Sequence, residues 1–148
     1  MNSPIVHFIW GWTGNVLMLI VGIWALWRGG RTERWGAAIM AIGWVVTPLV
    51  QTHRFNGIDP GIFTVDLLVF LALTALSLWS RRLWTLFAAA FMLDDVASHF
   101  AFGMASHIGG WAYITALGIW GGYGIIFALA AGMRTVERQR SQAALSST

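Results

Sequence analysis

Three polar side chains that can carry protons or bind cations lie in the middle of an apolar stretch, residues 83–105. They are Asp94, Asp95 and His99. The stretch is long enough to cross a bilayer, and a charged group at its centre costs roughly 2.5–3.5 kcal/mol on insertion scales, so such groups usually face protein or water. With about 100° of rotation per residue, Asp95 and His99 share one helix face, whereas Asp94 points toward a stripe of small residues.

A fourth polar side chain, Asp66, is expected beside this face. In the helix predicted over residues 60–79, Asp66 lies about six residues from the outer end, as His99 does in its own helix, so both lie roughly 9 Å below the membrane surface. A turn of two arginines joins the helices, which makes them antiparallel neighbours. Asp66 is therefore predicted to pair with His99, with Asp95 one turn deeper.

This cluster of Asp66, Asp95 and His99 has several interpretations. It predicts a proton-handling pocket, a ligand-binding pocket, or a metal site made of one imidazole and carboxylates. The structural alternative is a satisfied hydrogen-bond network that only fixes the register of two helices. Asp94 and Asn15, which lies near the centre of the first predicted helix, are the further candidates for ligand binding.

The other three histidines suggest a second group. His7, His53 and His107 are all expected at the outer membrane interface. Three imidazoles at one level bind Zn²⁺ or Cu²⁺ if the helices converge, and anchoring at the interface is the alternative. His99 alone is deep enough to be a single axial ligand of a haem or another pigment.

Composition indicates a membrane protein. The chain has 148 residues, of which 57% are hydrophobic and only 10% are charged, against about 25% charged in soluble domains. The absence of cysteine excludes disulfides, thiolate metal sites and cysteine nucleophiles. The excess of arginine lies in loops and the tail and needs no nucleic-acid partner to explain it. Nothing in the pattern predicts a catalytic residue or a secretory signal.

The expected fold is all-α, a polytopic bundle of five transmembrane helices. Apolar runs predict helices over five ranges, which are 5–27, 35–51, 60–79, 83–105 and 111–133. Thr32 is the expected N-cap of the second helix, and Asp59 that of the third, with Pro60 as its first residue. Residues 1–133 form one transmembrane domain, and residues 134–148 form a short polar cytoplasmic tail that we expect to be frayed or disordered.

Arginine distribution predicts the orientation. The first and third loops and the tail hold eight arginines, whereas the other side holds only Arg54. By the positive-inside rule the N-terminus is outside and the C-terminus is cytoplasmic. The predicted location is the inner membrane of a bacterium, and membrane lipids are the first expected partners.

Small residues four apart recur in the last predicted helix, at Gly124, Ala128 and Gly132. This spacing lets two helix backbones approach closely, which favours helix association in lipid. The stripe predicts either contact with another membrane protein or a second copy of this chain, or packing inside the monomer.

In length, five-helix topology and tryptophan content the chain resembles the tryptophan-rich sensory, or translocator, protein family. That likeness implies binding of porphyrins or sterol-like ligands, although the family's Trp-Asn-Pro-Pro-type signature has no counterpart near residues 28–35. Most of the chain is also similar to uncharacterised small five-helix inner-membrane proteins of alphaproteobacteria, which implies a location and no activity. That similarity rests on four segments: Glu33-Arg34-Trp35-Gly36-Ala37-Ala38, Thr47-Pro48-Leu49-Val50-Gln51, Val65-Asp66-Leu67-Leu68 and Gly110-Trp111-Ala112-Tyr113.

Three functions follow as expectations. Because only short loops and a tail lie outside the helices, the first is a non-catalytic inner-membrane subunit or scaffold of a larger complex that holds a pigment, haem or lipid. The second is a proton-linked carrier or ligand sensor that uses Asp66, Asp95 and His99. The third is a small metal-dependent membrane enzyme.

Overall fold

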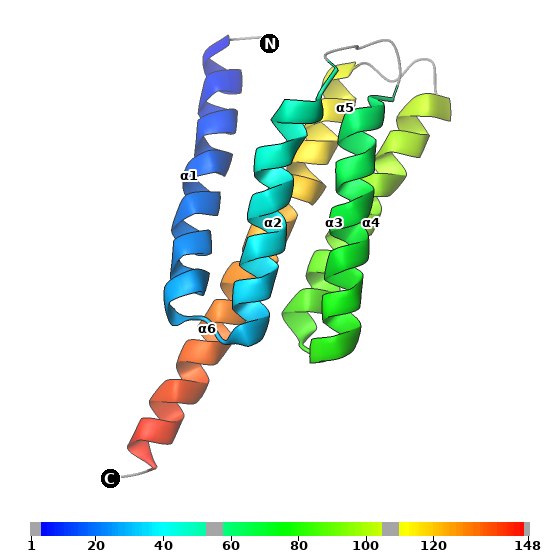
Figure 1. Cartoon of the computed structure of the whole chain (residues 1–148). Coiled ribbons are helices and arrows are strands. Elements are labelled where there is room, and N and C mark those ends of the chain that lie inside the picture. Colours follow the sequence, from blue (N-terminus) through cyan, green and yellow to red (C-terminus); the bar gives the residue numbers. More distant parts are fainter. Residues whose placement is uncertain (1–3, 53–57, 105–109, 147–148) are drawn as a thin grey trace.

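The computed structural model describes residues 4–52, 58–104 and 110–146. In these ranges all regular structure is helical, which confirms the all-α prediction (Figure 1). The elements are α1 (Pro4–Arg28), α2 (Arg31–Val50), α3 (Pro60–Ser80), α4 (Leu83–Met104), α5 (Gly110–Leu117), the π-helical η1 (Gly118–Gly124) and α6 (Ile125–Leu145). Because α5, η1 and α6 follow one another without a break, the chain forms five rods, as the sequence predicts.

Four of these rods are long and apolar enough to cross a membrane. The segments are Trp10–Arg28, Pro60–Ser80, Leu83–Met104 and Ala112–Leu145. The exception is α2, whose first turn carries Arg31, Glu33 and Arg34. The composition that predicted a polytopic bundle therefore agrees with helix lengths in the described residues.

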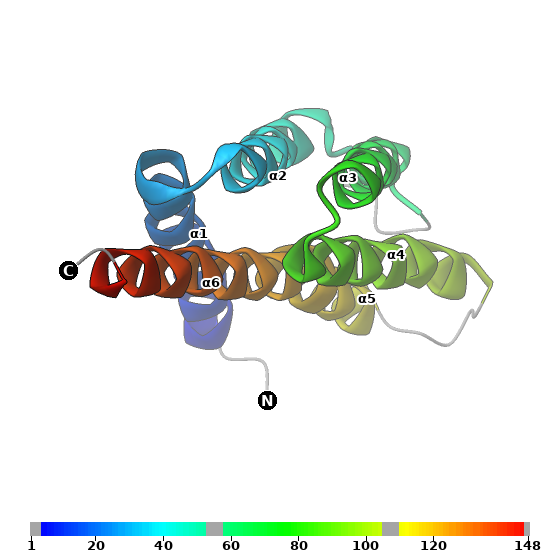
Figure 2. The same ribbon diagram turned by 90° about the horizontal axis from the view of Figure 1, so that it is seen from below.

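The rods form a closed ring when the bundle is viewed along its axis (Figure 2). Helices α1 to α4 pack against their neighbours in chain order, and α6 contacts α4, α1 and α2. The core of the bundle contains fully buried side chains such as Leu73, Met92, Leu129 and Met133. Since lipid removes most of the hydrophobic drive between helices, close packing and hydrogen bonds hold such a bundle together.

Trp84 of α4 shows how closely the helices pack. A Cβ atom at Gly36 of α2 would lie 2.4 Å from the Trp84 ring, and one at Gly132 of α6 would lie 2.5 Å from it. The Trp84 indole Nε1–H donates to Glu33 Oε1 over 3.0 Å, and Arg82 Nη1 donates to the same oxygen over 3.0 Å. Glu33 is fully buried, so these donors compensate its charge.

The ends of two helices test the predicted caps. Asp59 accepts hydrogen bonds from the backbone N–H groups of Gly61 and Ile62, at 2.9 and 3.4 Å, so the Asp59–Pro60 prediction is confirmed. The prediction of Thr32 as the second cap is wrong. Helix α2 starts at Arg31, and the Gly30 N–H donates to the Glu33 side chain over 3.0 Å.

The tail differs from the expectation of disorder, because α6 continues to Leu145 and extends beyond the other helices in Figure 1. Residues 134–145 contain three Arg, two Gln and two Ala, which are strong helix formers. Glu137 also fixes it to α1: Glu137 Oε1 accepts from Trp24 Nε1 over 3.1 Å and lies 3.5 Å from Arg28 Nη1. Arg140 Nη1 donates to the Arg28 carbonyl over 2.6 Å.

The predicted small-residue stripe lies inside the chain. A Cβ atom at Gly124 would lie 2.9 Å from Cγ of Phe91 in α4, and Gly132 lies against Trp84 of the same helix. Ala128, between them, is buried. The sequence left open whether this stripe contacts a partner or packs inside the monomer. At these three positions it packs inside the monomer.

Candidate functional site

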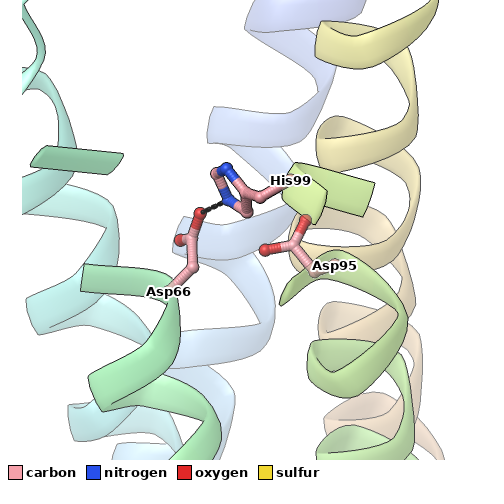
Figure 3. A group of neighbouring side chains, drawn as sticks. All are labelled: Asp66, Asp95 and His99. Atoms are coloured by element: carbon pink, nitrogen blue, oxygen red, sulfur yellow. Dashed lines mark hydrogen bonds and ion pairs between the residues drawn. The ribbon is translucent and has the colours of Figure 1, made fainter. Parts of the chain in front are cut away.

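Asp66, His99 and Tyr113 form a hydrogen-bonded chain across three helices. His99 Nε2 and Asp66 Oδ2 are 3.0 Å apart, which confirms the predicted pairing of α3 with α4 (Figure 3). On the other side of the ring, His99 Nδ1 and the Tyr113 hydroxyl of α5 are 2.6 Å apart. His99 is fully buried, with Phe63 and Tyr113 edge-on to it. Its ring is thus held from both nitrogens and by two aromatic neighbours.

Asp95 lies one helical turn from His99 on α4, and its carboxyl group points toward Asp66 and His99 (Figure 3). One carboxylate oxygen each from Asp66 and Asp95 and one His99 ring nitrogen all lie within 4.8 Å of one another. Asp95 is 1% exposed. Its Oδ1 has no hydrogen-bond partner among the described residues. A buried carboxylate oxygen of this kind is costly unless a proton or a cation compensates it.

The carboxyl group of Asp95 is seated on the π-helical segment. A Cβ atom at Gly121 would lie 2.7 Å from Asp95 Cγ, so any larger residue would collide with the carboxylate. Four of the seven residues of η1 are glycine, the residue with the weakest helix propensity after proline. Single π-helical turns inside α-helices are frequent at functional sites. Here the irregular turn brings the backbone against an ionisable group.

A cavity of about 460 Å³ opens beside this cluster, between α1, α2, α3, α4 and the α5–η1 rod. Asp66 and Asp95 are among the residues that line it, whereas His99 is not. Most of the other lining is apolar or aromatic, including Trp10 and Trp44. A cavity of this size with a few convergent polar groups is typical of sites for small organic molecules.

Asn15 also lines this cavity, as the sequence analysis suggested for ligand binding. The Trp44 Nε1–H donates to Asn15 Oδ1 over 2.7 Å and so joins α1 to α2. Asn15 and the acid pair therefore lie on different helices around one space.

Asp59 is the third carboxylate in the lining. Its Oδ2 accepts hydrogen bonds from the backbone N–H and the hydroxyl of Thr52, both 2.8 Å long, and its Oδ1 caps α3. Burial raises the pKa of the Asp59 carboxyl, but the hydrogen bonds from Thr52, Ile62 and Gly61 outweigh it and hold the pKa below its usual value. Asp59 is therefore a satisfied structural anion, unlike Asp95.

Of the other predicted residues, Asp94 does not belong to this cluster. Asp94 is exposed on the outside of α4, where its backbone carbonyl accepts from Ser98 Oγ over 2.8 Å. This separation from Asp95 is the one expected from helix geometry. His53 and His107 lie outside the described residues, and His7 belongs to α1 at a position whose side chain is not described.

His99 is poorly placed for the predicted axial bond to haem. Both ring nitrogens already have partners, and Asp66 lies 3.0 Å from Nε2, where a macrocycle would need to stand. A single small cation differs from a macrocycle in this respect, because Asp66 would be one of its ligands.

Sequence reasoning missed Tyr113 and Gly121 as members of the site. Tyr113 is one of only two tyrosines in the chain and lies in an apolar helix, which was a usable signal. The glycine-rich run in residues 118–124 was interpreted only as spacing for helix packing. Its irregular backbone depends on tertiary contact with α4, which no local pattern reveals.

Comparisons of the chain with protein-family models, curated proteins and solved structures gave no match. The chemistry of the site therefore rests on its own geometry. This geometry provides two carboxylates, one held imidazole and one phenol at the wall of a cavity.

Proposed function

We propose that the chain is a bacterial inner-membrane protein that binds a small ligand inside its helical bundle, as a carrier or a sensor. The observation that carries this proposal is the cavity of about 460 Å³ whose mostly apolar wall contains the Asp66–Asp95 pair. Ionisable groups in membrane-spanning segments are rare and usually mark a binding site or a proton path. A wall that is mostly apolar, with a small number of polar groups, favours a ligand that is itself mostly apolar.

The membrane location is supported by helix length and charge. Four helices are long and apolar enough to span a bilayer. Arg28, Arg31, Arg81 and Arg82 lie at the same end of the bundle, where α1 and α3 end and α2 and α4 begin. The positive-inside rule assigns that end to the cytoplasm. The N-terminus is then outside and the C-terminus inside.

A role as subunit or scaffold has less support. The stripe of Gly124, Ala128 and Gly132, which was the expected face for contact with another protein, packs against α4 within the chain. The cavity, in contrast, is a feature that a scaffold does not need. We therefore place ligand binding first and retain contact with lipids as part of the proposal.

A side chain that fills the cavity tests this function. Gly122 lines the cavity, and a Cβ atom there would have Trp44 Cη2 as its nearest neighbour at 3.9 Å, so Gly122→Leu adds bulk into open space. Gly11→Leu is the matched control, because nothing lies within 4 Å of its Cβ position and Gly11 does not line the cavity. Native mass spectrometry from mild detergent compares small molecules that remain bound to each variant.

The expected result is a bound molecule in the wild type and in Gly11→Leu that is lost in Gly122→Leu. Identical spectra for all three proteins, with or without a bound molecule, would count against the cavity as a binding site. The mass of the bound species then gives the ligand class directly.

A further inference from the structure

The cavity beside the acid pair has an excess of negative charge. Asp59, Asp66 and Asp95 line it, and the described part of its lining contains neither Arg nor Lys. Thr52 and the N-terminus of α3 satisfy Asp59. His99 Nε2 lies 3.0 Å from Asp66 Oδ2. Among these carboxyl groups in the described residues, Asp95 is the one with a buried oxygen, Oδ1, that has no hydrogen-bond partner.

The donor atoms of the cluster have the spacing of metal ligands. Around an ion with bonds of about 2.0–2.2 Å to nitrogen and oxygen in tetrahedral geometry, ligand atoms are roughly 3.3–3.6 Å apart. Asp66 Oδ2 and His99 Nε2 are 3.0 Å apart, and the whole set with Asp95 lies within 4.8 Å.

Asp95 provides a separate observation that points to a cation. It is 1% exposed, its side chain converges on Asp66 and His99, and its Oδ1 has no partner in the described part of the chain (Figure 3). A network that only held helices together would be expected to satisfy this oxygen. Buried charges in proteins are usually paired or coordinate metals.

Tyr113 completes the arrangement on the far side of His99. Histidine ligands generally hydrogen-bond through the ring nitrogen that does not bind the metal, which fixes tautomer and orientation. If Nδ1–H donates to the Tyr113 oxygen 2.6 Å away, the Nε2 lone pair points toward Asp66 and Asp95. The ring is also held by Phe63.

We propose that Asp66, Asp95 and His99 bind one divalent transition-metal ion, of the Zn²⁺ or Mn²⁺ type, at the wall of the cavity. Carboxylate and imidazole ligands without thiolate suit this class of ion. Two carboxylates and one divalent cation form a neutral unit, which lowers the cost of their burial in a membrane-spanning bundle.

This inference deepens the proposed function and rests on it for the identity of the cavity as a ligand site. Three protein ligands leave at least one coordination position open. Because Asp66 and Asp95 both line the cavity, we place the open position on the cavity side of the ion. The ligand class is then a mostly apolar molecule with an oxygen or nitrogen lone pair that binds the ion.

Metal binding to the purified full chain in detergent tests the site. After treatment with EDTA, the protein is dialysed against Zn²⁺ or Co²⁺, bound metal is measured by mass spectrometry, and Co²⁺ coordination is followed by visible absorption. We expect one ion per chain in the wild type. Asp94→Asn is the matched control, because Asp94 is the adjacent carboxylate on the same helix but is exposed and outside the cluster.

Asp95→Asn removes a ligand and its charge and should weaken Co²⁺ binding by more than about 100-fold. Tyr113→Phe keeps the three ligands but removes the support of His99, and such losses cost about 10–100-fold in affinity. It should also change the Co²⁺ spectrum. These shifts are measured on variants whose circular dichroism matches the wild type.

Two results overturn the inference. One is a wild type that binds no stoichiometric ion, and the other is an Asp95→Asn variant that binds Co²⁺ as the wild type does, since the ion then binds elsewhere. If Asp95→Asn does not fold, Tyr113→Phe decides, and unchanged affinity and spectrum overturn the site. The metal assay contains no organic ligand and the cavity assay contains no added metal, so either can fail alone.

Discussion

Asp95 and Gly121 are in direct contact, with the carboxyl group of one lying on the backbone of the other. A Cβ atom at position 121 would be 2.7 Å from Asp95 Cγ and 2.7 Å from Oδ1. Such distances are too short for real atoms, so α4 and η1 reach their positions only because residue 121 lacks a side chain. This contact links the site to the irregular part of the fifth rod.

The first prediction follows from this contact. Gly121→Ala should force Asp95 or η1 to move, at a cost of about 1–3 kcal/mol as for other overpacked sites. Gly122→Ala is the control, because the nearest atom to its added Cβ is 3.9 Å away. Thermal unfolding in detergent, followed by circular dichroism, compares the two. Equal midpoints would show that the 2.7 Å contact does not constrain the bundle.

Packing of α6 against α4 gives the second prediction. Gly124→Leu places a side chain where Phe91 Cγ is 2.9 Å and the Ile119 carbonyl oxygen is 3.2 Å from Cβ. We expect a loss of about 1–3 kcal/mol or more. Phe127→Leu lies on the exposed side of the same helix and should be nearly silent. If Gly124→Leu unfolds at the wild-type temperature, the stripe does not pack closely against α4.

Orientation is tested by labelling, which is simple because the chain contains no cysteine. Ile58 and Arg31 are both exposed and lie near opposite ends of the bundle. In intact cells Ile58→Cys should react with an impermeant thiol reagent, whereas Arg31→Cys should react only after the membrane is opened. The opposite pattern would reverse the proposed topology.

Asp59 predicts a pH dependence of stability. Its pKa in the folded protein lies below its usual value, so the charged form stabilises the fold. That contribution is complete above the unfolded pKa of about 3.9 and is lost as the pH falls through the lower folded value. At pH 7 Asp59→Ala should cost about 0.5–2 kcal/mol, as for other N-caps.

The difference between wild type and Asp59→Ala should therefore shrink below about pH 4. Urea unfolding at several pH values measures it, with Asp94→Ala as an exposed carboxylate control. A difference that is constant from pH 7 to pH 3 would mean that the cap acts without its charge.

Much of the fold was predictable because apolar runs and the signals that start and end helices involve residues close together in the sequence. The Asp59–Pro60 start of α3 and the number of rods follow from such signals. The pairing of Asp66 with His99 was also predictable, since a short turn between two antiparallel helices fixes which residues lie at equal depth. These predictions needed no knowledge of the other helices.

What the sequence could not reveal depends on contacts between distant segments. Tyr113 reaches His99 from another helix. The tail is helical where Glu137 meets Trp24, 113 residues earlier in the chain. The start of α2 had two candidate positions in the sequence. The Gly30 N–H donates to the Glu33 side chain, so the helix begins at Arg31 and Thr32 lies inside it.

The buried carboxylate of Glu33 has a consequence for the order of biosynthesis. Its donors are made much later, Arg82 after 49 residues and Trp84 after 51. When α2 leaves the ribosome, Glu33 has neither of them and keeps only the local Gly30 N–H as a donor. A carboxylate without a basic partner favours the aqueous boundary. In the proposed membrane, α2 should therefore complete its insertion only when α4 arrives. The second and fourth helices would then enter as a cooperating pair, out of strict sequence order.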